Sequence, residues 1–511
     1  MPDAADDQEP VLRLLADPAT YGGAEVRRID THAASLFLAG DRALKIKRAV
    51  RFPFLDYSTL ARRKAACAAE IEVNRPFAPQ LYRGVVPIAR AADGRLALGG
   101  EGTPVEWAVD MRRFDETRTL DHLADNGEID AALAGRLARA VAAAHARAPV
   151  VDAAPWIEAL ADFLDQNDAA FRDYPELFAP AAAERLGRLS RAALARLVPL
   201  LVARGRQGLV RRGHGDLHLG NIALIDGEPV AFDAIEFDPL IAAGDVLYDL
   251  AFLLMDLVER GLAAAANIVL NRYLGETRRP DDLDALAALP LFLSLRAAIR
   301  AKVTAARGAA AADARPAILR AARTYFDLAG RLIVPPASRL VAVGGLSGSG
   351  KSVLARALAP ELWPAPGAVV LRSDVERKAR FGVGESERLP ADAYTPEVTA
   401  VVYSTLADKA RRVVAAGHSA VVDAVFARPH ERALIAAAGA PFRGLFLTAD
   451  LATRLARVTD RSADASDADA AVARAQENYD LGDFARPDWI CVDASGTPAE
   501  TLARAREALS S

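Results

Sequence analysis

The chain has 511 residues, more than the roughly 250–300 at which a single hydrophobic core stops growing, so two or three domains are expected. Its formal net charge of −4, with acidic and basic residues interspersed, argues against nucleic acid as the main partner and favours small-molecule or protein substrates. The two cysteines are too few for a disulfide framework or a structural zinc site, which fits a reducing cytoplasm.

Neither export nor a membrane is expected. Residues 1–10 are acidic and lack the basic and apolar regions of a signal peptide. The most apolar long segment, residues 246–270, is interrupted by four charged residues, Asp249, Asp256, Glu259 and Arg260. Charges inside a membrane-spanning helix are costly, so this segment is predicted to be a buried core helix of a cytoplasmic protein.

The first part of the chain predicts a small β-rich lobe. Residues 1–20 form an N-terminal extension with a short helix near 11–16. Five strands are expected after it, at 26–30, 34–38, 42–47, 82–88 and 105–111. A Gly-rich turn at 93–102 separates the last two strands. Residues 120–209 have mostly helical periodicity, so a helical lobe follows the β-rich one.

Two lysines in the third of these strands are candidates for binding a phosphate. Period-two alternation puts Lys45 and Lys47 on one face of the strand, opposite its apolar side chains. A helix predicted at 58–75 carries Glu70 and Glu72. A strand lysine followed by a helix glutamate is how kinases hold the lysine that contacts the α- and β-phosphates. Such lysines are also typical of a solvated face, and the pattern does not choose between the two lysines or the two glutamates.

A second cluster lies in the run HGDLHLGN, which is followed by an apolar strand and a further aspartate. The spacing H-x-D-x-x-x-x-N, then a strand, then an aspartate, matches the kinase template for phosphoryl transfer. In that template Asp216, close to His214, would accept the proton of an attacking hydroxyl. Asn221 and Asp233 would hold Mg²⁺. The alternative is a turn in which these side chains bond the nearby backbone.

Residues 30–330, which carry these motifs in chain order, resemble the aminoglycoside phosphotransferase and choline kinase group, the small-molecule branch of the protein-kinase-like fold. The resemblance implies a bilobal α+β domain that uses ATP and Mg²⁺. It assigns Asp216 as the base, Asn221 and Asp233 as metal ligands, and Lys45 with Glu70 to the ATP side. His214 is carried over with the catalytic loop.

The same resemblance implies structural roles for further residues. Residues 244–251 resemble the family's aspartate-rich helix, which braces the catalytic loop, so Asp245 and Asp249 are expected to be structural. His145 and His218 are expected to be hydrogen-bonded packing residues. The chain lacks a G-x-G-x-x-G loop, and the family's substrate-binding carboxylates have no identifiable match here. An aminoglycoside substrate therefore does not follow.

The composition changes near residues 335–338, where two prolines and small residues make a short linker. The predicted domains are therefore 21–334 and 339–511, after the extension at 1–20. Helical segments separate five apolar runs in the second domain, which predicts an α/β fold with a five-stranded parallel sheet. The strands are expected at 340–343, 369–371, 420–422, 444–447 and 489–492.

The loop after the first of these strands fits G-x-x-x-x-G-K-[ST] at every fixed position, and it predicts an ATP site. Its residues are Gly345, Leu346, Ser347, Gly348, Ser349, Gly350, Lys351 and Ser352. Glycines let successive backbone N–H groups face a phosphate, Lys351 supplies a charge to the β- and γ-phosphates, and Ser352 offers a hydroxyl to Mg²⁺. The helix that follows points its positive end at the phosphates. The alternative is an accidental Gly-rich turn.

Two aspartates follow strands of this sheet, at the carboxyl ends where such folds bind ligands. Asp374 is a candidate base for a substrate hydroxyl, and Asp423 is a candidate carboxylate for Mg²⁺. Either residue is also typical of a helix cap or a turn.

Several arginines are candidates for binding anions in this domain. Arg377, Arg428 and Arg432 are predicted to contact an anionic or hydroxylated substrate. A later Arg-rich segment contains Arg454, Arg457 and Arg461, of which the last two are four residues apart and share a helical face. A mobile lid that brings arginines to the phosphates is one interpretation, and exposed arginines on a helix are the other.

Residues 338–508 resemble the P-loop small-molecule kinases of the gluconate kinase, adenylylsulfate kinase and zeta-toxin group. The whole chain resembles bacterial fusions of an aminoglycoside phosphotransferase-like domain with an AAA-type ATP-binding domain. The resulting hypothesis is an enzyme with two ATP- and Mg²⁺-dependent phosphotransferase sites for small-molecule acceptors. It has no nucleic-acid or membrane partner and no obligate protein partner. The alternative is a regulatory ATP-binding protein in which one domain gates the other.

Overall fold

The computed structural model describes residues 8–52, 55–310, 315–459, 465–482, 484 and 488–510, with the side chains of 309 and 310 left aside. Its contacts divide the chain into two units, each assembled from separate stretches. The first unit comprises residues 1–169 and 191–256, and the second comprises 170–190 and 257–511. The predicted domain boundary at 335–338 stays a prediction.

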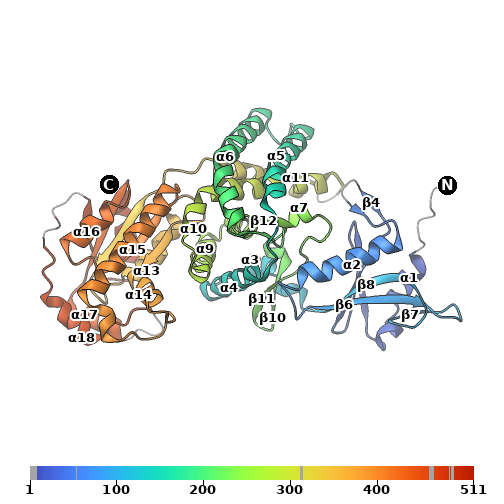
Figure 1. Ribbon diagram of the computed structural model, residues 1–511, viewed down its shortest axis with the longest axis horizontal. Coiled ribbons are helices and arrows are strands. Elements are labelled where there is room, and N and C mark those ends of the chain that lie inside the picture. Colours follow the sequence, from blue (N-terminus) through green and yellow to red (C-terminus); the bar gives the residue numbers. More distant parts are fainter. Residues whose placement is uncertain are drawn as a thin grey trace. The chain divides into compact units, whose positions relative to one another are not determined.

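The first unit begins with the predicted β-rich lobe (Figure 1). Its six-stranded sheet has the order β1-β2-β3-β8-β6-β7, and every neighbouring pair is antiparallel. The strands are β1 (Val26–Asp30), β2 (Ala34–Ala39), β3 (Arg42–Lys47), β6 (Tyr82–Arg90), β7 (Leu96–Leu98) and β8 (Thr103–Arg112). The short strand β7 lies inside the segment that was predicted to be only a turn. Helix α2 (Leu60–Asn74) packs against β8 and β6 and places Glu70 beside the sheet.

Smaller elements complete this unit. The helices are α1 (Glu9–Ala16), α3 (Leu120–Asp125), α4 (Ala131–Arg147), α5 (Ala153–Asp173), α6 (Pro180–Arg206), α7 (Pro239–Ala242) and α8 (Val246–Glu259), of which α5, α6 and α8 continue into the second unit. Two-stranded pairs are β4 (Arg51–Phe52) with β5 (Leu55–Asp56), β9 (Val210–Arg212) with β12 (Ala243–Asp245), and β10 (Ile222–Ile225) with β11 (Glu228–Ala231). The last pair is the hairpin that carries the candidate metal ligands.

The apolar segment at 246–270 is two helices rather than the single core helix that was predicted. Helix α8 ends at Glu259, and α9 (Ala263–Thr277) begins after Gly261, whose φ of 76° is a left-handed conformation that favours glycine. Most side chains of α8 are buried. Among the described residues, no helix combines the length and the apolar character that crossing a membrane requires.

The second unit contains the predicted five-stranded parallel sheet, with the order β14-β15-β13-β16-β17 (Figure 1). Its strands are β13 (Leu340–Gly345), β14 (Val369–Arg372), β15 (Ala420–Asp423), β16 (Phe442–Thr448) and β17 (Trp489–Asp493). The fold class is confirmed in both parts of the chain. The P-loop strand β13 is the central strand, so the loop that follows it lies at the middle of the carboxyl edge of the sheet.

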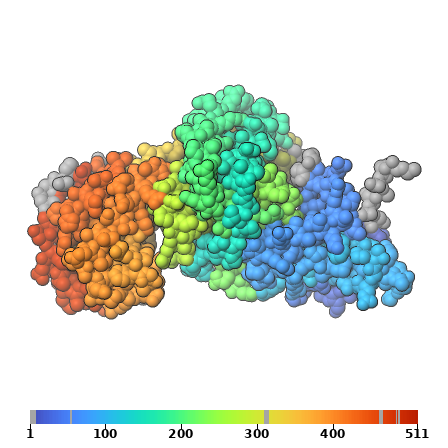
Figure 2. All heavy atoms as spheres, in the orientation of Figure 1, coloured from blue at the N-terminus to red at the C-terminus, as the bar shows by residue number. Residues whose placement is uncertain are grey.

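The helices in this part of the chain are α13 (Lys351–Leu358), α14 (Ser373–Arg380), α15 (Pro396–Ala415), α16 (Pro429–Ala436), α17 (Leu451–Thr459), α18 (Ala470–Ala475) and α19 (Pro498–Ser510). Leu354 and Leu358 of α13 and Ala505 of α19 share one core with Val341 and Val343 of β13. This core fixes the helix that begins at Lys351, and Figure 2 shows this part of the chain, coloured orange to red, as a closely packed body.

A helical segment before the sheet also belongs to the second unit. It comprises α9, α10 (Asp281–Asp284), α11 (Leu289–Ala310) and α12 (Arg315–Leu332). Asn271 on α9 accepts a hydrogen bond from Val370 N–H at 2.7 Å and donates to the Ala368 carbonyl at 3.1 Å. These bonds satisfy backbone groups on the free side of the edge strand β14. Arg412 of α15 adds ion pairs to Asp281 at 2.9 Å and Asp284 at 2.6 Å.

A buried ion pair in the first unit fixes the start of α8. Arg204 donates from Nε and Nη2 to the Asp245 carboxylate at 2.5 and 2.8 Å, and both residues are almost fully buried. Replacing Arg204 with Met leaves a buried carboxylate without its cation, which is expected to cost about 3–5 kcal/mol of unfolding free energy. Hydrogen exchange at α8 in increasing denaturant measures this loss for the unit concerned. The exposed neighbour Arg206→Met is the matched control, and equal protection in both variants would contradict the assignment.

Candidate functional site

In the first unit, Lys45 joins two carboxylates that are far apart in the sequence. Its ammonium lies 2.9 Å from Glu70 Oε1 on α2 and 2.6 Å from Asp233 Oδ1, which follows β11. Burial would lower the pKa of Lys45, but the Asp233 and Glu70 carboxylates outweigh burial and hold that pKa well above its ordinary value. Lys45 therefore stays charged, as a phosphate-binding group must.

The neighbouring Lys47 occupies a different environment on the same face of β3. Its side chain is buried, its ammonium lies 2.6 Å from Glu70 Oε2, and it also bonds Glu236. Tyr57 donates its hydroxyl to Glu236 at 2.9 Å. Glu72 is exposed on the other side of α2. The sequence did not choose between Lys45 and Lys47. In the structure Lys45 bonds both Glu70 and Asp233, whereas Lys47 is buried.

Asp216 and Asn221 lie on the loop between β9 and the β10–β11 hairpin. The Asn221 amide donates to the Asp216 carboxylate at 3.0 Å and to the Asp216 carbonyl at 3.0 Å. Phe232 N–H donates to the Asn221 carbonyl at 2.9 Å, so the hairpin register brings Asn221 to the end of β11 where Asp233 follows. The side chains of Asp216 and Asp233 are 38% and 50% exposed, which leaves both accessible to a ligand.

Asp233 has a left-handed backbone with φ of 62°, which is uncommon for a residue other than glycine. Its N–H donates to the Tyr82 hydroxyl at 3.0 Å, and this bond helps to hold the conformation. Tyr82 comes from β6, so the sheet of the β-rich lobe contributes directly to the position of this carboxylate. Backbone strain of this kind is concentrated at functional sites.

His214 and α8 hold the loop in place. His214 is fully buried, its Nε2 bonds the Phe232 carbonyl at 2.9 Å, and burial lowers its pKa. The Asp249 carboxylate accepts from His214 N–H at 2.8 Å and Gly215 N–H at 2.9 Å. Asp256, two turns further along α8, accepts from Leu219 N–H at 2.9 Å. These contacts make His214 a positioning residue rather than a group that touches substrate.

The two histidines assigned to packing have hydrogen-bond partners. His145 Nε2 lies 3.1 Å from the Asp249 carboxylate and is buried. His218 accepts from Gly220 N–H at 3.1 Å and packs against the Phe252 ring. Its Nε2 also lies 3.5 Å from Asp216 Oδ2, beyond a good hydrogen bond.

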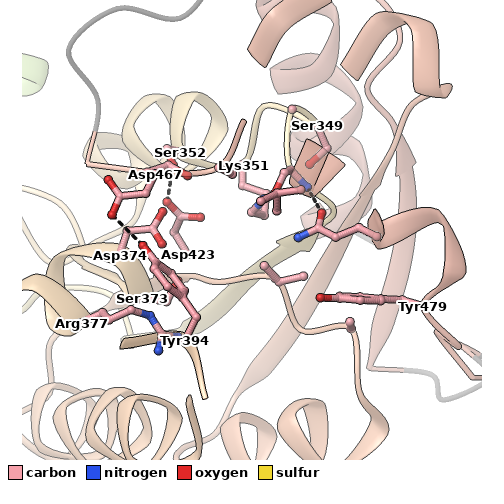
Figure 3. A pocket seen from close by; sticks show the side chains of 18 of the residues that line it. Ser349, Lys351, Ser352, Ser373, Asp374, Arg377, Tyr394, Asp423, Asp467 and Tyr479 are labelled. Carbon is pink, nitrogen blue, oxygen red and sulfur yellow. Dashed lines mark hydrogen bonds between the residues drawn. The ribbon is translucent and has the colours of Figure 1, made fainter. Parts of the chain in front are cut away.

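In the second unit, the P-loop turns on glycines. Gly345, Gly348 and Gly350 have φ of 138°, 85° and 92°. A Cβ on Gly348 would stand 2.4 Å from the Arg454 carbonyl oxygen, so only glycine fits there. Lys351 Nζ donates to the Leu346 carbonyl at 3.1 Å, and the loop residues from Ser347 onward line a cavity of about 1360 Å³ (Figure 3).

Ser352 and Asp423 meet at the end of β15 and β13, as the sequence predicts for a magnesium site. The Ser352 hydroxyl donates to Asp423 Oδ2 at 2.5 Å (Figure 3). Arg372, at the end of β14, donates from Nε to the same carboxylate oxygen at 3.2 Å and from Nη2 to Ser352 Oγ at 3.0 Å. Arg372 is 8% exposed, so a buried cation already lies against both oxygens.

The donor sets in both units suit Mg²⁺, because carboxylate, amide and hydroxyl oxygens are the ligands that this ion prefers. Asn221 and Asp233 would hold it in the first unit, and Ser352 and Asp423 in the second. In each set one carboxylate also bonds an internal cation, Lys45 or Arg372.

Asp374 lies in the same cavity, on the first turn of α14. Figure 3 shows its side chain next to that of Asp423. Burial raises the pKa of the Asp374 carboxyl and the charge of Asp423 raises it further, while Lys351 and Arg372 act in the opposite direction. A carboxylate with a raised pKa is better matched to accepting a proton near neutral pH.

The candidate arginines have different environments. Arg377 and Arg428 line the cavity, and Arg377 stacks on the Tyr394 ring and pairs with no carboxylate among the described residues. Arg432 is not a substrate contact as predicted, because it is buried and donates to the carbonyls of residues 426, 427 and 481. Arg454 is buried and donates to the Ser347 carbonyl at 3.3 Å, so it supports the P-loop from behind.

The predicted lid is described only in part. Arg457 lines the cavity and donates to the Gly496 carbonyl at 2.7 Å, and Arg461 lies outside the described residues.

Family models match two separate stretches of the chain. The model of the phosphotransferase enzyme family matches residues 37–289, and the model of an AAA domain matches residues 340–480. Uncharacterized proteins of Mycobacterium tuberculosis and Mycobacterium bovis are each 30% identical over 469 residues, which is 89% of this chain and 90% of theirs. The chain belongs to the same family as these proteins. It is an ATP-dependent phosphotransferase of the kinase type.

Solved structures match each part separately. A gluconokinase from Sinorhizobium meliloti is 23% identical, covering 34% of this chain and 92% of its own, with a TM-score of 0.24. A choline/ethanolamine kinase family protein from Mesorhizobium loti is 14% identical, covering 64% of this chain and 98% of its own, with a TM-score of 0.36.

The sequence analysis did not identify several residues of the two candidate sites. Arg372, Glu236, Tyr82 and Asp256 have no motif of their own, and each gains its role from a partner far along the chain. A weak signal existed for Asp256, because it is seven residues after Asp249 and therefore on the same face of a helix. Gln476 was also missed, although its buried side chain accepts from Ser347 N–H at 2.6 Å.

Arg372 bonds the two oxygens that are predicted to hold a metal ion in the P-loop domain, so it would compete with that ion. Replacing Arg372 with Met should strengthen Mn²⁺ binding to the nucleotide-free protein on the order of tenfold, because Asp423 loses its internal cation. Electron paramagnetic resonance of free Mn²⁺ measures this affinity without any turnover. Arg380→Met, an exposed arginine on α14 that does not line the cavity, is the control. Equal Mn²⁺ affinity in a folded Arg372→Met protein and the wild type would show that Arg372 does not occupy the metal position.

Proposed function

We propose that the chain is an enzyme with two phosphotransferase sites, each moving the γ-phosphoryl group of ATP to a small-molecule hydroxyl or amine. The observation that supports this most is that each phosphate-binding site has an accessible aspartate beside it, Asp216 in the first unit and Asp374 in the second. A protein that only binds nucleotide needs no carboxylate for an acceptor proton. The proposal includes no nucleic-acid, membrane or obligate protein partner, and a cytoplasmic location.

In the first site, the side chains divide the work between nucleotide and acceptor. Lys45, oriented by Glu70, binds the α- and β-phosphates, and Asn221 and Asp233 hold the metal. Magnesium, when bound, neutralises the charge that grows on the phosphoryl oxygens. Asp216 accepts the acceptor proton, and its contact with the Asn221 amide keeps the carboxylate close to the metal ligands. His214 and Asp249 keep this loop rigid, which lowers the entropy cost of positioning the Asp216 carboxylate.

In the second site, the P-loop amides and Lys351 bind the β- and γ-phosphates, and Ser352 with Asp423 holds the metal. Asp374 accepts the proton of the acceptor. Its raised pKa fits this task, because the carboxylate is a stronger base than an exposed aspartate. Arg377, which stacks on Tyr394 and pairs with no carboxylate in the described parts of the chain, contributes positive charge to the acceptor side of the cavity.

The regulatory alternative has one observation in its favour. Helix α9 lies within the residues that match the phosphotransferase family, yet its Asn271 bonds the edge strand β14 of the P-loop sheet. Strand β14 leads directly to Arg372 and Asp374. A gate of this kind requires that Asn271→Ala changes P-loop turnover without any acceptor for the first site.

The first site is tested by Asp216→Asn in the full chain with Lys351→Met present, so that the P-loop domain is silent. Losing the base should slow transfer by on the order of 10²–10⁴ while ATP affinity stays nearly the same. Transfer of labelled γ-phosphate to a metabolite panel measures the rate, and Asp226→Asn, on the exposed turn of the β10–β11 hairpin, is the control. Unchanged turnover of Asp216→Asn would remove its assignment as base.

The second site is tested by Asp374→Asn in the Asp216→Asn background. We expect kcat for the P-loop acceptor to fall by on the order of 10²–10⁴ with nearly unchanged ATP affinity. Lys351→Met should lower both ATP affinity and turnover, because it removes a phosphate contact. Asp392→Asn, an exposed aspartate before α15, is the matched control. A Lys351→Met protein that consumes ATP at the full rate would contradict the P-loop assignment.

A further inference from the structure

The segment that follows the undescribed residues 460–464 is fastened to the acceptor side of the P-loop cavity. The Asp467 carboxylate accepts from Leu389 N–H at 3.0 Å and from the Tyr394 hydroxyl at 2.7 Å, and it pairs with Lys378 Nζ at 3.1 Å. Lys378 is 1% exposed, so the ammonium is buried under the segment. Three separate partners therefore fix the position of Asp467, which lines the same cavity as Asp374 (Figure 3).

Fixing Asp467 also fixes its neighbour Ser466. Ser466 lines the same cavity as Asp374, Lys351 and the P-loop. Burial raises the pKa of the Asp374 carboxyl, and the nearby Ser466 hydroxyl acts in the opposite direction. A hydroxyl beside the candidate base, in a cavity that the phosphate-binding loop also lines, occupies the place where the proposed function puts an acceptor hydroxyl.

Two roles fit a hydroxyl in this place. In the first, the hydroxyl only packs beside Asp374 while the contacts of Asp467 hold the segment at the cavity. In the second, the hydroxyl is itself an acceptor. The second role needs nothing beyond what the cavity already contains, because the base, the P-loop lysine and the metal ligands Ser352 and Asp423 all lie around it. Ser373 is the other hydroxyl next to Asp374, but it is the first residue of α14 and belongs to the wall of the cavity.

We propose that Ser466 is a phosphorylation site of the P-loop domain, modified within the same chain when no other acceptor fills the cavity. This inference rests on the proposed function of that domain. Ser466 Oγ attacks the γ-phosphorus of ATP, the new Oγ–P bond forms, and the bond from the γ-phosphorus to the bridging oxygen breaks. ADP leaves with that electron pair, and the hydroxyl proton passes to the Asp374 carboxylate.

The product has a physical consequence. A phosphoserine carries about −1.5 to −2 charges at neutral pH. It would stand beside the carboxylates of Asp374 and Asp467, which repel it. The modified segment is therefore expected to leave the cavity, so that the reaction stops at one phosphate per chain and opens the site to other acceptors.

The experiment incubates the full chain, first treated with a phosphatase that is then removed, with γ-labelled ATP and Mg²⁺ and no acceptor. Mass spectrometry locates the phosphate. We expect label on Ser466 approaching one phosphate per chain, at a rate per molecule that does not depend on protein concentration. Lys351→Met and Asp374→Asn should each lower the rate on the order of 10²-fold. Ser466→Ala should lose the label, whereas Ser373→Ala should keep it on Ser466.

Two results overturn the inference in distinguishable ways. If the P-loop site consumes ATP in a Lys351-dependent manner and Ser466 stays unmodified, Ser466 only packs beside Asp374, and the proposed function stands. If no Lys351-dependent ATP consumption or transfer occurs under any condition, the proposed function fails and the inference fails with it. Label on Ser466 that persists in Lys351→Met would also overturn the inference, because another site would be its source.

Discussion

A site proposed for both a divalent cation and a polyphosphate must hold opposite charges close together before either one arrives. In both units a cation of the chain itself lies against the carboxylates of the proposed site. Lys45 bonds Asp233 and Glu70 in the first unit, and Arg372 bonds Asp423 and Ser352 in the second. Each cation stabilises carboxylates that would otherwise repel one another or be buried unpaired. The two units reach the same electrostatic solution on unrelated folds.

The cations differ in what they do once ligands bind. Lys45 has two carboxylate partners, Glu70 and Asp233. In the proposed site it exchanges Asp233 for a phosphate and keeps its ion pair with Glu70. Arg372 instead bonds both oxygens of the proposed metal site, and a metal ion and a guanidinium cannot share them at close range. The proposed function of the P-loop domain therefore requires that Arg372 moves when metal and nucleotide bind.

The sequence predicted the parts of the fold that follow from local periodicity. The five parallel strands, the antiparallel strands around Lys45 and the P-loop all depend on patterns within a few residues. Strand β7 was hidden inside a Gly-rich turn, and the helix expected at 246–270 was interrupted at Gly261, because the hydrophobic pattern continues through a residue that reverses the backbone. Local patterns state which face is apolar but not where a chain turns in space.

The sequence predicts the candidate sites less completely than it predicts the fold. Motif spacing singled out Lys45, Asp216 and Ser352, yet the partners that define their chemistry are distant, as with Lys45 and Asp233, which are 188 residues apart. The arginines show the same difficulty. Arg432 and Arg377 look alike in sequence, and both are buried and donate to backbone carbonyls, but only Arg377 also lines the cavity. Residue type predicts what a side chain can bind, and only the fold decides what lies within its reach.

The edge strand β14 connects these points. Its outer backbone groups would be left without partners if α9 did not supply Asn271 and Asn267, which bond Val370 and Ala368. The same four-residue strand ends in Arg372 and leads to Asp374, so one short element carries the internal cation and the candidate base. A strand bonded on both edges is harder to shift than a free one, and the geometry of the P-loop site therefore depends on a helix that precedes that domain in the sequence. The helical segment from α9 onward is in this sense part of the P-loop site's scaffold, which explains why it groups with the sheet rather than with the lobe that carries Asp216.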